Sequence, residues 1–324
     1  MAMSITLSNS AKKEVDVKWS SSAPANLMLM GEHSVVYGHK AIACSLNHRL
    51  SIHWSTRDDY EIHIISTLGH HITDTKTLAE HPNLKWVMAC LQHYQSKLTS
   101  GLNIEIETDF SSTVGLGSSA AVLAAMLGGL DYLTQEKASL KTLFDTGLKI
   151  IQSIQGRGSG TDLAASLHGG IILFDPQNQT IQKLACDFPI SLVYCGYKTP
   201  TATVLEKVAT DWQDQPELLQ HLYQIMGQTT EAAYQSLANN HIESFYKLVN
   251  TYHGLMDALG VNDATLSHLV YQLRQDREVE ASKISGSGLG DCVIGFGIMQ
   301  PQTLANYESI LAHLSTEGLS ITSN

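Results

Sequence analysis

The strongest chemical signal in the sequence is a run of small residues between a strand-like segment and a helix-like segment. The run consists of Val114, Gly115, Leu116, Gly117, Ser118, Ser119, Ala120 and Ala121. Glycines let the backbone approach an anion closely, and the first N–H groups of a helix have no acceptor within the helix. Because a helix start also carries partial positive charge, the run predicts a phosphate-binding site. It is not a Walker loop, because the GxxxxGK[ST] pattern is absent.

A second Gly-rich run, residues 156–161, leads into Asp162 and then into small residues with helical spacing. Such a carboxylate is either a helix N-cap or a side chain positioned for chemistry. A carboxylate held beside a hydroxyl can accept its proton as a general base. The sequence alone leaves both interpretations of Asp162 open.

Two further segments place polar groups or glycines between apolar strands. Glu32 and His33 follow the apolar run 27–30 and precede another apolar run, so both need partners if they are buried. Near the C-terminus, Gly286, Ser287 and Gly288 belong to a GxGxG run. That run is followed by a strand-like segment rather than by a helix, which excludes a Rossmann fingerprint and favours a tight ligand-contacting turn.

The elements that would position these residues follow from hydrophobic periodicity. Residues 47–66 predict a β-hairpin with its turn at 57–59, and residues 102–108 predict a strand before the phosphate loop. Further strands are predicted at 169–174, 181–186, 191–197 and 319–322, and residues 282–297 predict a strand, a tight loop and a strand. Helices are predicted at 82–97, 118–134, 140–154, 218–238, 242–259, 264–275 and 301–314. This order predicts an α+β protein.

Composition limits the classes of function. The 324 residues are 43% hydrophobic and 16% charged, which is enough to bury a large core. The net charge of −11 argues against a nucleic-acid partner, and no apolar run is long enough for a membrane span. The five cysteines form no CxxC pair, and residues 1–22 lack the features of a signal peptide. We therefore expect a cytoplasmic protein with a small-molecule substrate.

Taken together and in this order, the four segments resemble the GHMP kinase superfamily. The resemblance spans about residues 23–297, and the GEHSVVYG run at 31–38 is most similar to the mevalonate kinases. It implies the two-lobed GHMP kinase fold, with an N-terminal ribosomal-protein-S5-like lobe at 1–187 and a C-terminal ferredoxin-like α/β lobe at 188–324. It also implies that ATP and Mg²⁺ bind in the cleft between the lobes, and that the protein can form a homodimer.

The resemblance assigns roles to individual residues. Asp162 would accept or orient the proton of the attacking hydroxyl, and Ser119 would contact Mg²⁺. Glu32, His33, Thr203 and Gly288 would line the substrate pocket. The ATP phosphates would be bound by the first Gly-rich run, here called the phosphate loop, and by the GxGxG run near the C-terminus, here called the third Gly-rich loop. The residues are Val114, Gly115, Leu116, Gly117, Ser118, Ser119, Ala120, Gly286, Ser287 and Gly288.

The sequence departs from the mevalonate kinase pattern at two charged positions. Asn26 stands where these kinases usually have a catalytic lysine. We therefore place Asn26 among the catalytic positions, although it lacks the positive charge of the lysine. Lys198, Lys283 and Arg157 are candidates for the missing cation. The family's Mg²⁺ glutamate falls at Ile151, with Gln152 and Gln155 nearby.

The leading functional prediction is phosphorylation of the 5-hydroxyl of mevalonate by ATP. Phosphomevalonate kinase is the alternative, since Asp291 after the third loop resembles that enzyme and residues 156–166 fit either. A GHMP-fold protein that binds nucleotide without turnover is a further alternative.

Overall fold

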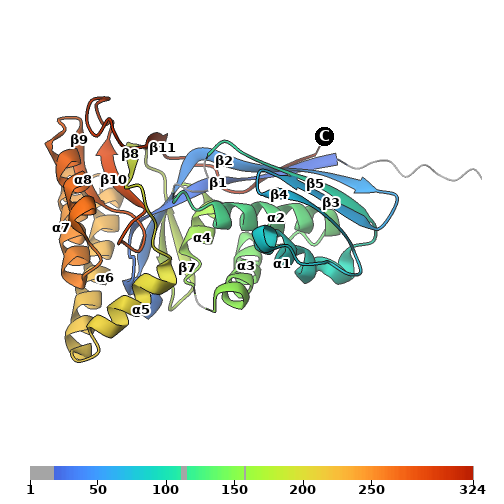
Figure 1. Cartoon of the computed structure of the whole chain (residues 1–324), viewed down its shortest axis with the longest axis horizontal. Helices are drawn as coiled ribbons and strands as arrows, with labels where there is room; N and C mark the ends of the chain where they lie inside the picture. Colours follow the sequence, from blue (N-terminus) through green and yellow to red (C-terminus); the bar gives the residue numbers. More distant parts are fainter. Residues whose placement is uncertain (1–17, 111–114, 157, 324) are drawn as a thin grey trace, which may run out of the picture.

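The structure, a computed structural model, describes residues 18–110, 115–156 and 158–323 of the chain. Within these residues the strands form one sheet of eight strands and one of four. Helices pack against both sheets (Figure 1). The predicted α+β class is therefore confirmed.

The larger sheet runs in the order β12–β1–β2–β5–β3–β4, and β6 and β7 branch from β2. Nearly all of its neighbouring strands are antiparallel, but β3 and β5 are parallel. The strands of this sheet are β1 (Lys18–Met30), β2 (Ala41–Arg57), β3 (Glu61–Ser66), β4 (Gly69–Asp74), β5 (Gly101–Thr108), β6 (Ile171–Asp175), β7 (Thr180–Leu184) and β12 (Ser320–Ser323).

The helices of the first half lie together on one side of this sheet (Figure 1). Among them α2 is the central one, because it contacts β1, β2, α1, α3 and α4. These elements are α1 (Lys85–Tyr94), α2 (Ser118–Thr134), α3 (Leu140–Gln155), α4 (Thr161–His168) and the short 3-10 turns η1 (Ser34–Tyr37), η2 (Pro82–Leu84) and η3 (Gln95–Lys97).

Small residues let α2 lie close to the sheet. A Cβ atom on Gly129 would stand 2.5 Å from the Trp54 ring, so a larger residue would separate the helix from β2. Trp19 stacks on Trp54 with ring centroids 5.6 Å apart, and its indole N–H donates to the Gly129 carbonyl at 3.1 Å. This packing holds the second half of α2 against β1 and β2.

The smaller sheet runs in the order β11–β8–β10–β9, and α7 and α8 pack against β9. The helix α6 packs against α7 and also reaches η1 and β2 of the first half. These elements are β8 (Pro189–Tyr194), α5 (Thr201–Asp211), α6 (Pro216–Ala238), α7 (Ile242–Leu259), α8 (Ala264–Gln275), β9 (Val279–Ile284), β10 (Cys292–Gly297) and β11 (Ser309–His313).

The predicted hairpin at 47–66 is wrong, although both of its strands exist. The strand β5 lies between β2 and β3 and pairs with each of them. Gly101 begins β5 at the turn, where its N–H donates to the Asp59 carbonyl and a Cβ would stand 2.2 Å from the Glu61 carbonyl oxygen. A strand from 40 residues further along the chain thus takes the place that local alternation gave to the hairpin partner.

The predicted helix at 301–314 is also wrong, because β11 occupies its second half. β11 pairs with β8 as an edge strand of the smaller sheet. Asp276 holds the preceding turn, accepting hydrogen bonds from the Gln300 N–H at 2.8 Å and the Thr303 hydroxyl at 2.6 Å. These long-range pairings outweigh the helical spacing of the local sequence. The helix α5 was not predicted.

The end of the described chain returns to its beginning. β12 pairs with β1 along the register from Trp19–Ser323 to Ser22–Ser320, and Leu46 bridges Leu314. The larger sheet therefore contains residues from both sides of the predicted lobe boundary at 187/188, and that boundary stays a prediction. No helix in the described part of the chain is both long and apolar enough to cross a membrane.

Candidate active site

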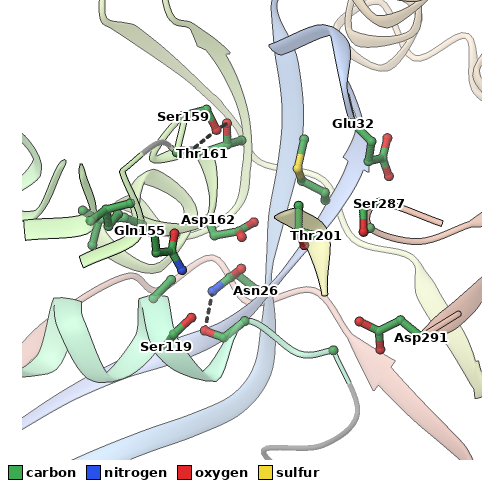
Figure 2. A pocket seen from close by; sticks show the side chains of 18 of the residues that line it. Asn26, Glu32, Ser119, Gln155, Ser159, Thr161, Asp162, Thr201, Ser287 and Asp291 are labelled. Atoms are coloured by element: carbon green, nitrogen blue, oxygen red, sulfur yellow. Dashed lines mark hydrogen bonds between the residues drawn. The ribbon is translucent and has the colours of Figure 1, made fainter. Parts of the chain in front are cut away.

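A cleft of about 660 Å³ brings together segments from both halves of the chain. Its lining comes from the end of β1, the loop before η1, the starts of α2, α4 and α5, and the loop between β9 and β10. Figure 2 shows Asn26, Ser119 and Asp162 on one side of this cleft and Ser287 and Asp291 on the other. The four segments singled out in the sequence thus meet in one place.

The phosphate loop presents the start of α2 to the cleft. Gly117 is the residue before the helix, with a φ of 64°, and no side chain caps the helix end. Ser118 and Ser119 begin the helix and line the cleft together with Gly115, Leu116, Gly117 and Ala120. Such an uncapped helix start can bind an anion through its N–H groups and its dipole. Val114 lies outside the described residues.

Asn26 supports this loop through hydrogen bonds. Its side-chain amide donates to the Gly117 carbonyl at 3.2 Å (Figure 2) and to the Ser166 hydroxyl at 2.9 Å. Its backbone N–H donates to the Leu116 carbonyl, and Ser166 in turn donates to the Pro24 carbonyl. Asn26 is 1% exposed and joins β1, the phosphate loop and α4. The position lines the cleft but supplies a neutral amide.

Asp162 lies in the first turn of α4 and points into the cleft (Figure 2). Gly160 rather than Asp162 is the N-cap residue, so the capping interpretation does not apply to Asp162. Its side chain faces the water of the cleft, but the walls of the cleft partly desolvate the carboxylate and so raise its pKa to about 6. The nearby negative charge of Glu32 acts in the same direction. The opposite charge of Lys198 partly offsets this rise. A carboxylate with such a pKa can accept a proton near neutral pH.

Glu32 and Lys283 form a buried ion pair between the two halves. The Lys283 Nζ lies 2.5 Å from Glu32 Oε1, and both side chains are almost fully buried. Burial raises the pKa of Glu32 and lowers that of Lys283, while their mutual attraction opposes both shifts. The Tyr252 hydroxyl accepts from the Gly31 N–H at 2.9 Å and donates to the Glu32 carbonyl at 3.0 Å. These contacts fix the loop that carries Glu32.

His33 joins the same loop to the third Gly-rich turn. Its Nε2 lies 2.8 Å from the Ser287 carbonyl, which it can reach only as an N–H donor. Burial lowers the pKa of His33, so the ring is neutral and its Nδ1 is a lone-pair acceptor. Its φ of 62° is costly for a residue with a side chain. With the backbone in this conformation, the His33 side chain lies at the wall of the cleft.

The other predicted residues of the second half divide into two groups. Gly286 and Ser287 line the cleft, and a Cβ on Gly286 would meet nothing within 4 Å. Gly288 instead packs on the chain after α7, where a Cβ would stand 2.2 Å from the Val261 carbonyl oxygen. Thr203 lies in the first turn of α5, but the threonines that line the cleft from this segment are Thr199 and Thr201. The ligand-binding roles of Gly288 and Thr203 stay predictions.

The donors for a metal ion are few. Among the described residues, no group of three His, Cys, Asp or Glu side chains could hold a metal. Ile151 and Gln155 line the cleft where the resemblance implies a glutamate, and the Ile151 side chain packs against Gly158. The Ser119 hydroxyl faces the cleft (Figure 2). Since Mg²⁺ is usually bound through substrate phosphates, water and few protein oxygens, these residues fit a metal held mainly by phosphates.

Sequence reasoning named Lys198 among three candidates for the missing cation, but it did not predict the partner of Lys198 and gave no role to Tyr252. Of the other two candidates, Lys283 pairs with Glu32, and Arg157 lies outside the described residues. Lys198 and Asp291 line the cleft as an ion pair, with 2.8 Å between Nζ and Oδ2. Tyr252 supports the Glu32 loop from α7, and the sequence around it predicted only a helix. The signal for Asp291 was its place directly after the third Gly-rich run.

Comparison with known proteins agrees with this geometry. Residues 84–170 match the family model of the GHMP kinases N terminal domain. A mevalonate kinase of Methanothermobacter thermautotrophicus is 30% identical over 94% of this chain and 100% of its own length. Two solved structures share the fold at 20% identity: a Lin0012 protein from Listeria innocua (TM-score 0.82, 94% of this chain and 99% of that one) and the L. major mevalonate kinase in complex with R-mevalonate (TM-score 0.77, 92% and 96%).

The family model and the kinase relatives, together with the two-sheet fold, show that the chain is a small-molecule kinase with the GHMP fold, an enzyme that uses ATP. Within that class, the chain belongs to the mevalonate kinase family, as its 30% identity over nearly the full length of a family member shows.

Proposed function

We propose that the protein transfers the γ-phosphoryl group of ATP to the 5-hydroxyl of mevalonate. The observation that carries the proposal is the meeting of the phosphate loop, Asp162 and the Glu32–His33 loop in one cleft of a chain that belongs to this family. The L. major neighbour, a mevalonate kinase, was solved with R-mevalonate.

In this mechanism the start of α2 binds the phosphates, and Asp162 accepts the proton of the acceptor hydroxyl. The hydroxyl oxygen bonds to the γ-phosphorus while the bond from that phosphorus to the bridging oxygen of ADP breaks. Positioning and charge stabilisation supply most of the catalysis in such transfers. Ser119 would contact Mg²⁺, which when bound neutralises part of the phosphate charge.

The acceptor pocket would lie beside Glu32 and His33. The neutral His33 ring offers Nδ1 as an acceptor for a substrate hydroxyl, and the Glu32 carboxylate is already paired with Lys283. The lysines among the described cleft residues are Lys85 and Lys198, and no arginine is among them. So sparse a basic lining suits an acceptor with one carboxylate better than one that also carries a phosphate.

The test is a coupled ADP-release assay with MgATP and four acceptors: mevalonate, 5-phosphomevalonate, galactose and homoserine. We expect turnover with mevalonate at a kcat/KM at least a hundredfold above the others, because a site built for one set of hydroxyls leaves polar groups unpaired with another. Turnover with 5-phosphomevalonate alone would establish the alternative kinase. Tight ATP binding without turnover on any acceptor would establish a nucleotide-binding protein.

A further inference from the structure

Among the described residues that line the cleft, acidic side chains outnumber basic ones. Of these residues, Glu32, Asp162 and Asp291 are acidic, and Lys85 and Lys198 are basic. Lys283 neutralises Glu32 from behind, and Lys85 is exposed at the start of α1 with its ammonium over the Trp86 ring. The remaining carboxylates, Asp162 and Asp291, therefore have Lys198 as the cation that acts on both.

Lys198 stands next to the phosphate loop. Its partner Asp291 lies against Gly115, where a Cβ would stand 2.5 Å from Asp291 Oδ1. A carboxylate in this place repels a triphosphate unless a cation lies with it. The lysine also acts electrostatically on Asp162, which Figure 2 shows across the cleft from Asp291. Lys198 thus acts both on the carboxylate beside the predicted phosphate site and on the predicted proton acceptor.

The backbone around Lys198 is held while its side chain stays accessible. The Asp291 N–H donates to the Tyr197 carbonyl at 2.7 Å, and the Thr199 hydroxyl donates to the Leu289 carbonyl at 2.6 Å. The side chain itself is 49% exposed, so its ammonium can leave Asp291 for a ligand in the cleft. Asn26, by contrast, is buried and has both amide hydrogens engaged below the phosphate loop.

We propose that Lys198 is a catalytic residue that binds the phosphoryl group being transferred, with Asp291 as its partner before nucleotide binds. A cation here stabilises the charge on the transferred group and supplies, from the other side of the cleft, the positive charge that Asn26 lacks. This inference rests on the proposed kinase function, but it does not depend on which acceptor is used.

The experiment compares Lys198→Met and Lys198→Arg with the wild type, and uses Lys207→Met as the control. Lys207 is an equally exposed lysine on α5 that pairs with Asp211. We expect kcat with MgATP and mevalonate to fall roughly 10²–10³-fold in Lys198→Met, as when a charge-stabilising donor is lost. Lys198→Arg should keep part of the activity, and Lys207→Met should match the wild type.

Two further readouts separate a catalytic role from a structural one. Lys198→Met should weaken binding of the non-hydrolysable ATP analogue AMPPNP by roughly tenfold, with ADP affinity within about twofold, because the lost contact is to the terminal phosphoryl group. The charged groups that act on Asp162 are Glu32 and Lys198, so removing the lysine should also move the acidic limb of kcat/KM to higher pH.

An unchanged ratio of AMPPNP to ADP affinity in Lys198→Met would overturn the inference, and so would a kcat within about threefold of the wild type. The binding readout needs no acceptor. If the wild type turns over none of the four acceptors, the proposed function fails, while the affinity ratio still decides the role of Lys198.

Discussion

At the scale of single residues, the proposed mechanism depends on Asp162, whose carboxylate faces the cleft from the first turn of α4. None of the described side chains donates a hydrogen bond that would hold its ionised form, and the surrounding protein raises its pKa to about 6. These conditions suit a group that must take up a proton during the reaction rather than one that serves as a permanent anion.

Replacing Asp162 by Asn keeps the size of the side chain and removes the proton acceptor. We expect kcat to fall by roughly 10²–10⁴-fold, the usual contribution of a general base, with AMPPNP affinity within a few-fold of the wild type. Steady-state kinetics and calorimetric titration of the same preparation check both numbers. Undiminished turnover would remove Asp162 from the mechanism.

The pKa of Asp162 also sets a pH dependence. Because the pKa is raised to about 6, the carboxylate is ionised above that pH and protonated below it. We expect kcat/KM to be level above about pH 7 and to fall as the pH drops through 6. A profile of kcat/KM between pH 5 and 8 measures this, provided the protein stays folded by circular dichroism. A profile that stays flat down to pH 5 would contradict the assignment.

At the scale of elements, the phosphate loop is set by how β1 and α2 meet. Gly117 must be glycine for two reasons: its φ is 64°, and a Cβ would stand 2.1 Å from Asn26 Oδ1. The buried Asn26 cannot move away without losing its hydrogen bonds to α4 and to the loop. From the sequence, we explained this glycine by the close approach of an anion. The structure adds a second reason, which is the close approach of the Asn26 side chain.

We therefore expect Gly117→Ala to weaken ATP binding by at least tenfold, since the loop must shift to relieve the contact. Gly254→Ala is the matched control. Gly254 lies exposed within α7 and a Cβ there would meet nothing within 4 Å, so alanine should raise the free energy of unfolding by about 0.5–1 kcal/mol. Nucleotide titration and urea denaturation of both variants give the comparison. Wild-type nucleotide affinity in Gly117→Ala would argue against this account of the loop.

Prediction from the sequence succeeded where the signal was local. The helix α2 begins and ends at the predicted residues. Gly117, in a left-handed conformation, precedes its first residue, and nearly all of the small and apolar residues between 120 and 130 are buried. It failed where pairing was long-range: β5 separates β2 from β3, and β11 replaces a helix. The ion pairs of Lys283 with Glu32 and of Lys198 with Asp291 join residues more than 90 positions apart, and no spacing rule connects them.

At the scale of the whole molecule, two side-chain contacts join the second half of the chain to the cleft, in addition to the contacts of Tyr252 and α6. The Glu32–Lys283 pair links the loop after β1 to β9, and His33 reaches the Ser287 carbonyl in the loop after β9. Both contacts come from the Gly-Glu-His segment. We infer that this segment sets the distance between the phosphate loop and the third Gly-rich turn.

Removing one partner of the buried pair should be far more costly than removing both. We expect Lys283→Met to lower the free energy of unfolding by roughly 3–5 kcal/mol, because the Glu32 charge is left buried and unpaired. The double variant Glu32→Gln with Lys283→Met should recover part of that loss. Urea denaturation of the single and double variants completes the cycle. Equal losses in Lys283→Met and in the double variant would mean that the unpaired Glu32 charge is not the source of the loss.

The pairing of β12 with β1 bears on how the protein is made. Residues 320–323 are the last described strand to leave the ribosome, yet they complete the edge of a sheet whose other strands were synthesised much earlier. Until translation reaches them, β1 presents an open edge on the nascent chain, and an exposed strand edge invites pairing with other chains. Stop codons placed just before this strand should therefore yield a polypeptide that aggregates in the cell, even though every residue of the cleft is still encoded.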